Sequence, residues 1–284
     1  MSKSLKEKIA FWSFRLLTLI VLLILFWILE FILVRGWKMI NWDFITKMPE
    51  DGMTKGGIYP AIIGTLCLVA GSMIFSFPLG VLAGIYIHEF TADSWFKRFV
   101  KVMTNNLAGI PSIVFGLFGM ALFVKTLKFG DSILAGSLTL GLLALPLIIR
   151  VTEEALIAID DSFRLGSYAL GATKMQTIHR IILPMAMPNI ITGLILSIGR
   201  VSGETAPILF TVAAYFLPKL PTSIFDQVMA LPYHLYVIST SGTKIQESRD
   251  MAYGTALVLI LFVLLLNLLA NALRRYFSNK VKMN

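Results

Sequence analysis

Two charged residues interrupt an otherwise apolar run in the last third of the chain. Arg200 and Glu204 lie in the sequence GRVSGETAP, roughly 18 to 24 Å beyond Pro188 if the run is helical. Charges deep in a membrane are costly, so such residues face the interior of a helix bundle or water. A guanidinium can bind the oxygens of a phosphate-like anion through two parallel hydrogen bonds, and it stays charged. These residue types therefore suit a path for a small oxyanion.

The neighbours of this pair fit the same hypothesis. Ser202 and Thr205 add hydroxyl donors. Glu204, four residues after Arg200, can pair with it on one helix face and weaken its hold on an anion, so that the anion leaves. The alternative is an internal ion pair that only fixes helix packing. The candidate substrate-path residues are Arg200, Ser202, Glu204 and Thr205.

A polar stretch precedes this run, and we call its residues 160–185 the docking segment. Gly171 fits the end of a short helix, and Thr173 with Gln176 forms a capping-box pattern that starts another. Pro184 and Pro188 are expected to close the second helix. The pattern predicts two short helices joined at a glycine, with an apolar stripe along the second. Such an element suits the groove of a partner protein, or it rests on the bilayer interface.

The composition requires a membrane around these elements. Hydrophobic residues make up 57% of 284 positions and charged residues only 14%, a balance that a soluble domain could not cover with polar surface. The single cysteine, Cys67, can form no internal disulfide. Apolar stretches of about 20 residues predict transmembrane helices, and six are expected, at residues 10–34, 61–87, 107–124, 132–149, 190–216 and 251–273.

Charges in the loops predict the orientation. With six spans both termini share one side, and Lys and Arg are more frequent there than on the other side. Both termini should therefore be cytoplasmic. The net charge of +9 is then mainly a topology signal, and the dispersed basic residues argue against nucleic-acid binding. The loop at residues 35–59 is expected to have little regular structure, and residues 222–236 to form a short helix at the external surface.

Several functional classes lack their sequence signals. No phosphate-binding G-x-x-x-x-G-K-[ST] motif and no hydrolase or metalloprotease motif occurs, and the three histidines are widely separated. We expect no catalytic residues, no metal site and no cofactor in this chain. An ion-coupled secondary transporter usually shows several intramembrane carboxylates or inverted repeats, whereas only Glu204 lies deep in an apolar run.

The docking segment carries a recognisable motif. Gly171, Ile181, Leu183 and Pro184 stand in the spacing G-x9-I-x-LP, which resembles the cytoplasmic loop of permease subunits of ABC importers. The family's Glu-Ala-Ala opening would fall on residues 165–167, where this chain has Leu-Gly-Ser. The resemblance implies that the loop docks on an ATP-hydrolysing subunit. The implied docking residues are Ser167, Ala169, Leu170, Gly171, Ala172, Thr173, Ile181, Leu183 and Pro184.

More of the chain resembles one branch of this family, the PstA-type permeases of phosphate transporters. The matching pieces are GGIYPAIIGTL, LAGIPSIVFGLFG, ALGATKMQTI, GRVSGETAPILFT and FDQVMALPYHLY, which begin at residues 56, 107, 169, 199 and 225. The resemblance implies an all-α polytopic membrane protein of the type I ABC importer (MetI-like) permease fold with six transmembrane helices. Residues 1–55 would hold the cytoplasmic lead, the first helix and an external loop, and residues 56–284 the five-helix permease core.

The same resemblance implies a function and partners. The chain would be a non-catalytic permease subunit in the cytoplasmic (inner) membrane of a prokaryote that moves inorganic phosphate by alternating access. Its partners would be a PstC-like permease (or a second copy of this chain), two PstB-like ATPase subunits that bind ATP and Mg, and a PstS-like phosphate-binding protein. The alternatives are a permease for another oxyanion and an ion-coupled secondary transporter.

Overall fold

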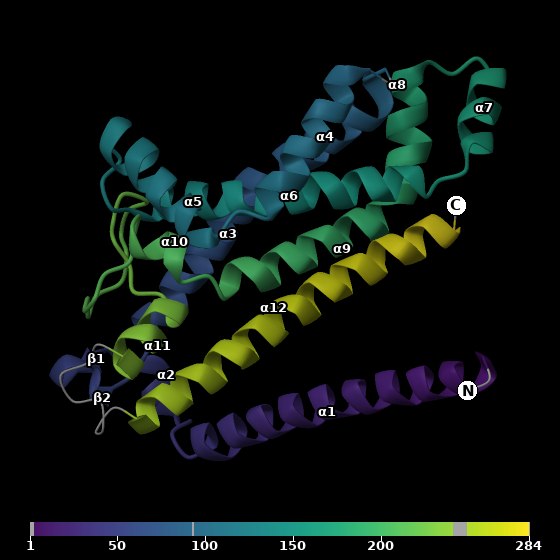
Figure 1. The fold of residues 1–284 in the computed structure, drawn as a ribbon. Coiled ribbons are helices and arrows are strands. Elements are labelled where there is room, and N and C mark those ends of the chain that lie inside the picture. The colour runs from purple at the N-terminus through teal and green to yellow at the C-terminus, as the bar shows by residue number, and fades with distance from the viewer. Residues whose placement is uncertain (1–2, 93, 241–248, 284) are drawn as a thin grey trace.

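The computed structural model describes residues 3–92, 94–240 and 249–283, and it is mostly helical (Figure 1). Among these residues, five helices are long and apolar enough to cross a membrane, and a bent pair gives a sixth candidate span. The candidates agree with the predicted number of spans. Figure 1 shows the N- and C-terminal ends at one end of the molecule, together with α7 and α8; we call this the docking end.

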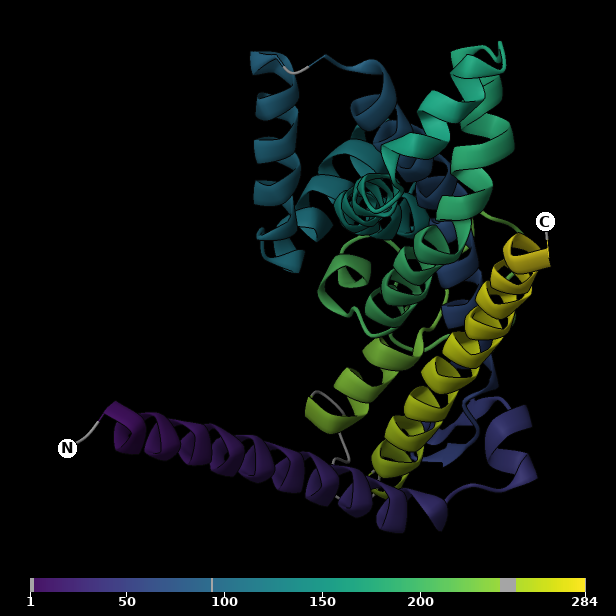
Figure 2. The same cartoon turned by 90° about the vertical axis from the view of Figure 1, so that its right-hand side faces the viewer.

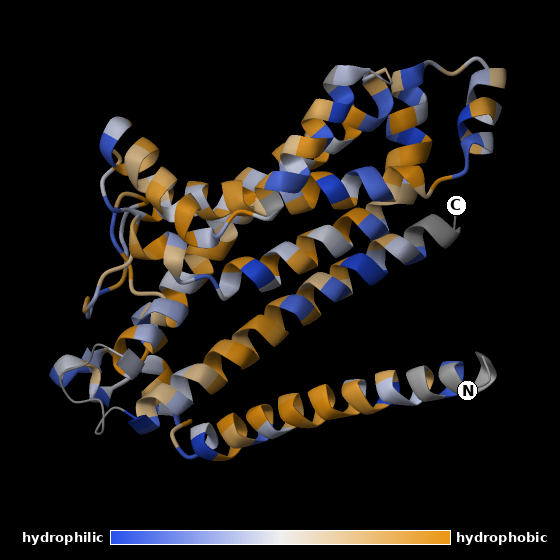
Figure 3. Cartoon of the chain, viewed as in Figure 1, coloured by the Kyte–Doolittle hydropathy of each residue, from blue (hydrophilic) through white to orange (hydrophobic). Residues whose placement is uncertain are grey.

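The first helix, α1 (Lys3–Trp37), lies outside the bundle formed by the others. It contacts α12 (Arg249–Met283), where the ring of Phe31 meets Tyr253 edge-on at 5.5 Å and Gly36 lies against the Tyr253 backbone. None of its most apolar window is buried. Figure 2 shows it diverging from the other helices, and Figure 3 shows hydrophobic residues along its middle and more polar ones towards its ends. That distribution suits a helix surrounded by lipid.

The bundle is centred on α3 (Tyr59–Ile85) and α6 (Ile133–Ile157), with α9 (Leu183–Ser202) beside them. Small residues on α3 let the two helices approach closely: Gly80 lies against Ile148, and Gly84 against Thr152. Lipid provides no hydrophobic drive for helix pairing, so close packing at small residues holds such helices together. α12 packs against the other side of α9.

The predicted third span is bent. The helix α4 (Trp95–Ala108) is followed by α5 (Ser112–Gly119) and the π-helical η3 (Met120–Thr126). The chain turns by 100° between α4 and α5. The span therefore does not begin at residue 107 as predicted. Pro111 lies at the turn, just before α5. Because a proline has no N–H to continue the preceding helix, it favours a break at this point.

The predicted fifth span ends early. Its helix begins at Lys174, in α8 (Lys174–Thr177) and the π-helical η4 (Ile178–Ile182), and continues as α9 to Ser202. The expectation that Pro184 and Pro188 close the second docking helix is thus wrong. Pro184 directly follows the π-helical turn η4, and the helix continues through it and through Pro188. The helix stops at Gly203, and in the rest of the predicted span, to residue 216, only the short α10 (Ala206–Leu209) is helical.

The loop at residues 35–59 is more ordered than predicted. It contains α2 (Trp42–Thr46), the short strands β1 (Pro49–Glu50) and β2 (Lys55–Gly56), which pair antiparallel, and the 3-10 turn η1 (Asp51–Met53). Phe44 and Met53 from this loop are buried in a cluster with residues of α3, α11 and α12. α2 is held by Asn41, whose side chain accepts a hydrogen bond from the Phe44 N–H.

The helix α11 (Leu231–Thr240) corrects the expectation of a surface helix over residues 222–236. It begins at Leu231, which is completely buried, and Thr65 of α3 accepts a hydrogen bond from the Leu231 N–H at 2.8 Å. α11 therefore belongs to the core beside α3 and α12. The sequence signal for this helix was real, but its burial depends on segments far away in the chain.

Gly64 of α3 gives a test of this packing. A Cβ at this position would overlap the backbone carbonyl of Met229, which cannot move aside as a side chain can. We expect Gly64→Ala to lower the free energy of unfolding by about 1–3 kcal/mol. Thermal unfolding of the purified protein in detergent measures this. Gly166→Ala is the matched control, since a Cβ there meets nothing within 4 Å and the exchange in a helix favours folding.

His234 of α11 gives a second test. Its side chain is 2% exposed, and neither ring nitrogen has a hydrogen-bond partner within the described part of the chain. Burial lowers the pKa of His234 to about 4. Below about pH 6.5 the unfolded chain takes up a proton that the folded protein does not, so stability is lost as the pH falls towards 4.

We expect a loss of about 2 kcal/mol between pH 7 and pH 5 from this residue, measured as a falling melting temperature. His234→Leu should flatten that dependence. His179→Leu is the control, because the His179 side chain is exposed. An unchanged pH dependence in His234→Leu would contradict a neutral, buried imidazole.

Candidate functional site

Arg200 lies in the last turn of α9, and Glu204 follows two residues after the helix ends. The prediction that the two share one helix is therefore wrong, but the chain still brings them together. Backbone bonds from Gly203 N to Arg200 O and from Glu204 N to Val201 O continue the turn. Arg200 Nε lies 3.6 Å from Glu204 Oε1.

The contact leaves donors of Arg200 free. At 3.6 Å it is an ion pair without a close hydrogen bond. Within the described residues, no hydrogen bond of 3.5 Å or less is made by the guanidinium. The Arg200 side chain is 34% exposed and that of Glu204 17%. A guanidinium that is partly exposed and has unshared donors can accept a bidentate oxyanion.

Ser202 and Thr205 are placed less favourably for an anion. Ser202 is buried, and its hydroxyl donates to the carbonyl of Ile198 at 2.7 Å, so in this conformation its proton is not available to a ligand. Thr205 is half-buried at the start of α10. Ser202 and Glu204 line a cavity of ≈ 10 Å³ together with residues of α3, α6 and α11, which is about the space of one water molecule.

Glycines set how closely α9 approaches its neighbours. A Cβ on Gly193 would collide with Val151 of α6, and one on Gly199 would contact Asn267 of α12. Gly116 of α5 lies against the backbone of Ala206 in α10. The end of α9 is thus fixed from several sides, which positions Arg200 although the helix ends directly after it.

The docking segment has the helix starts and the glycine between its two helices that its sequence predicts, although the second helix does not end at the prolines. α7 (Asp161–Ala169) is capped by Asp160, whose carboxylate accepts the Ser162 N–H at 2.8 Å; hydrogen bonds from Ser162 lower the pKa of Asp160. Gly171 follows α7 with φ +81, a conformation that costs glycine little. The capping box of Thr173 and Gln176 is present in both directions.

An apolar surface with a hollow lies on the docking segment. Leu170 is 90% exposed, and Leu165 and Met175 are also exposed. Beside them lies an open hollow of ≈ 270 Å³, lined by Ser167, Leu170, Gly171, Ala172, Gln176, Arg180 and Ile181. An apolar surface of this kind suits contact with another protein or with lipid.

The predicted docking residues differ in their exposure. Ala169, Leu170, Gly171, Thr173 and Pro184 are exposed, and Ala172, Ile181 and Leu183 are half-buried. Ser167 is buried, and its hydroxyl lies 2.8 Å from that of Thr177. It therefore joins α7 to α8, and only its edge contributes to the hollow. The fold creates the apolar surface by holding the two short helices side by side through this contact.

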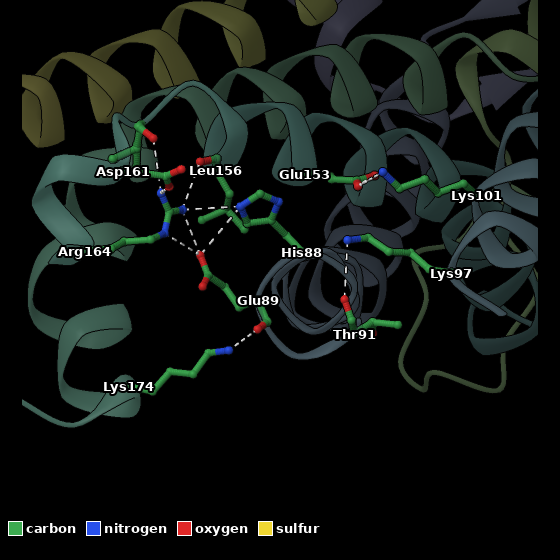
Figure 4. Close-up of polar contacts among 11 residues, drawn as sticks. His88, Glu89, Thr91, Lys97, Lys101, Glu153, Leu156, Asp161, Arg164 and Lys174 are labelled. Atoms are coloured by element: carbon green, nitrogen blue, oxygen red, sulfur yellow. Dashed lines mark hydrogen bonds and ion pairs between the residues drawn. The ribbon is translucent and has the colours of Figure 1, made fainter. Parts of the chain in front are cut away.

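A buried ion pair at the docking end was not predicted. Arg164 of α7 bonds Glu89, which lies in the π-helical η2 (Tyr86–Phe90) at the end of α3 (Figure 4). The two residues are far apart in the sequence, and each alone resembles an ordinary interfacial charge. The available signal was the position of Glu89 directly after an apolar span.

Among the described residues, no group of acidic, histidine or cysteine side chains could hold a metal ion.

Comparisons with known proteins agree with this arrangement. The model of a family described as binding-protein-dependent transport system inner membrane component matches residues 76–283. The chain is 31% identical to the probable ABC transporter permease protein YqgI of Bacillus subtilis over the full length of both. It is 38% identical to the phosphate transport system permease protein PstA of Mycobacterium leprae, over 96% of this chain and 90% of that protein.

The fold is also found in solved structures. A chain in the crystal structure of a bacterial alginate ABC transporter, in complex with its alginate-bound periplasmic protein, superposes with a TM-score of 0.70. The match covers 97% of both chains at 18% sequence identity. At that identity the similarity speaks for the architecture of the chain and for nothing finer.

Proposed function

Because this chain belongs to the family of inner-membrane components of binding-protein-dependent transport systems, with the fold of type I ABC importer permeases, we propose that it moves inorganic phosphate across the cytoplasmic membrane. Several relatives that cover most of the chain are phosphate permeases by name. The observation that carries the proposal is Arg200, which stands at the end of α9 with unshared donors beside Glu204.

The two charges have complementary roles in this proposal. Arg200 binds two oxygens of the anion, and its charge does not depend on pH. Glu204 returns to Arg200 when the anion has left, which limits the affinity and keeps the guanidinium from binding a second anion too tightly. Thr205, half-buried at the start of α10, would add a hydroxyl donor, whereas the Ser202 hydroxyl bonds the backbone within α9.

Energy for transport comes from partner subunits in this proposal. The docking segment inserts Leu170 and the residues that line the hollow into a groove of a PstB-like ATPase subunit. That subunit binds ATP and Mg, whereas this chain binds neither and catalyses no reaction. A PstC-like permease completes the path, and a PstS-like protein delivers phosphate from outside. Both termini, at the same end as the docking segment, are then cytoplasmic, in line with the excess of Lys and Arg there.

Uptake of labelled orthophosphate tests the proposal. Initial rates at low concentration are compared between cells lacking the gene and cells carrying it back, with a parallel arm depleted of ATP. We expect uptake that is restored by the gene and lost without ATP. Competition by arsenate, but not by sulfate, is expected for a phosphate path. Uptake that does not change with the gene would exclude phosphate and favour another oxyanion, and uptake that persists without ATP would favour an ion-coupled transporter.

A further inference from the structure

A single buried carboxylate connects the docking segment to the long helices. Glu89 lies in η2 at the end of α3, and its side chain is 6% exposed. Its Oε1 accepts hydrogen bonds from Nη2 of Arg164 at 2.9 Å and from Nε at 3.3 Å. The Arg164 side chain is itself only 12% exposed. A buried pair of this kind is screened by dissolved salt much less than an exposed one.

The same guanidinium also holds the end of α6. It donates to the carbonyl oxygens of Leu156 and Ile159, each at 3.2 Å, and to Asp161 Oδ1 at 2.9 Å. Carbonyls at a helix C-terminus lack partners within the helix, and a cation there also suits the helix dipole. Arg164 therefore joins three elements, the ends of α3 and α6 and the first turn of α7 (Figure 4).

The second half of the docking segment reaches the same residue. Lys174, the first residue of α8, donates to the backbone carbonyl of Glu89, and its ammonium lies 4.8 Å from the ring centre of Phe90. Both docking helices thus converge on Glu89, one through its carboxylate and one through its backbone. The chain itself connects the docking segment only to α6 and α9.

We infer that movement of the docking segment is transmitted to α3 through Glu89. We call the contacts of Glu89 with Arg164 and Lys174 the joint. This rests on the proposed function, in which ATPase subunits move that segment. α3 and α6 are packed along their length by glycine contacts, so a displacement applied at Glu89 and at the end of α6 moves both helices together. Without the contacts of Arg164, α7 is tied to α6 only by the connecting residues 158–160, and it can shift relative to the ends of both α3 and α6.

A distance measurement tests the joint directly. Spin labels are placed at Gly166→Cys on α7, where an added Cβ meets nothing within 4 Å, and at Ile74→Cys on α3, where the native side chain is 76% exposed. Cys67→Ala removes the native thiol. In the assembled transporter we expect one narrow distance distribution, with or without bound ATP analogue. Glu89→Gln should broaden it, because the amide removes the buried counter-charge of Arg164 and leaves only the exposed carboxylate of Asp161.

The structure offers a matched control at the same end of the molecule. Glu153 of α6, whose side chain is 13% exposed, forms an ion pair with Lys101 of α4, whose side chain is 40% exposed, and this pair does not involve the docking segment (Figure 4). Glu153→Gln should leave the distance distribution narrow. Lys174→Met removes only the second connection and is expected to give an intermediate width, which keeps the test valid if Glu89→Gln fails to accumulate in the membrane.

Transport coupling is the second measurement. Phosphate imported per ATP hydrolysed should fall about tenfold in Glu89→Gln, within the usual range of coupling energies, while the ATPase subunits remain bound; Glu153→Gln should keep the ratio of the wild type. A purely structural role would lower import and hydrolysis together. A narrow distribution or an unchanged ratio in Glu89→Gln would overturn the inference. If the wild type does not import phosphate, the proposed function fails, and the distance measurement still decides on the joint.

Discussion

Replacing Arg200 with alanine is expected to lower the initial rate of phosphate uptake at least about 100-fold. The guanidinium is partly exposed and makes no close hydrogen bond to Glu204, so its donors are available to an anion. Each charge-assisted hydrogen bond contributes about 1.5–3 kcal/mol. Losing two of them corresponds to at least about two powers of ten in rate.

The chain offers a control at the same position. Arg200→Lys keeps the charge but loses the planar pair of donors, so we expect an intermediate rate, nearer to that of alanine if two-point binding matters. The amount of each variant in the membrane is measured in parallel by immunoblotting. We expect it to be unchanged, because α9 is packed by glycines whose contacts these variants leave intact. Wild-type uptake by Arg200→Ala at equal abundance would show that the ion pair serves packing only.

Replacing Leu170 with glutamate is expected to prevent the ATPase subunits from binding. Leu170 is 90% exposed and forms part of the wall of the hollow on the docking segment. Burying a leucine contributes about 1.5–3 kcal/mol. A carboxylate without a partner in the same groove costs several kcal/mol more. We therefore expect an association at least about 100-fold weaker, and no ATP-dependent uptake.

Co-purification with a tagged permease measures this association. Leu170→Met is the matched control, since it keeps the volume and the apolar character, and it should retain both binding and uptake. The substitution lies on a side chain that packs against nothing in the fold core, so membrane insertion should be unaffected. If Leu170→Glu retained its ATPase subunits, the docking surface would have to lie elsewhere on the docking end.

Sequence signals predicted the structure correctly where the contacts join residues that are close together in the chain. The capping box of Thr173 and Gln176 and the left-handed Gly171 involve residues within one turn of each other, and the structure has both. Arg200 and Glu204 still meet across the end of α9 for the same reason. Composition alone predicted a membrane protein, and the structure agrees in the number of candidate spans.

The ends of two spans were predicted less well. Apart from Arg200 and Glu204, no charge interrupts residues 190–216, yet the helix stops at Ser202 because glycine at 203 and the contacts of α10 with α5 favour a break. Similarly, the chain bends before Ser112 within an apolar run. Hydropathy reports only that a segment avoids water, and a broken helix buried in protein avoids water as well as a straight one.

The sequence by itself determined the membrane class, the two docking helices and the pairing of Arg200 with Glu204, because composition and contacts within a few residues suffice for these. Only the tertiary structure decided that Ser167 and His234 are buried and that Ser202 donates its hydroxyl to the backbone. It also decided that Glu89 accepts a hydrogen bond from Arg164, which lies 75 residues further along the chain. Such contacts depend on how distant helices pack, and no local pattern in the chain encodes the position of a partner on another helix.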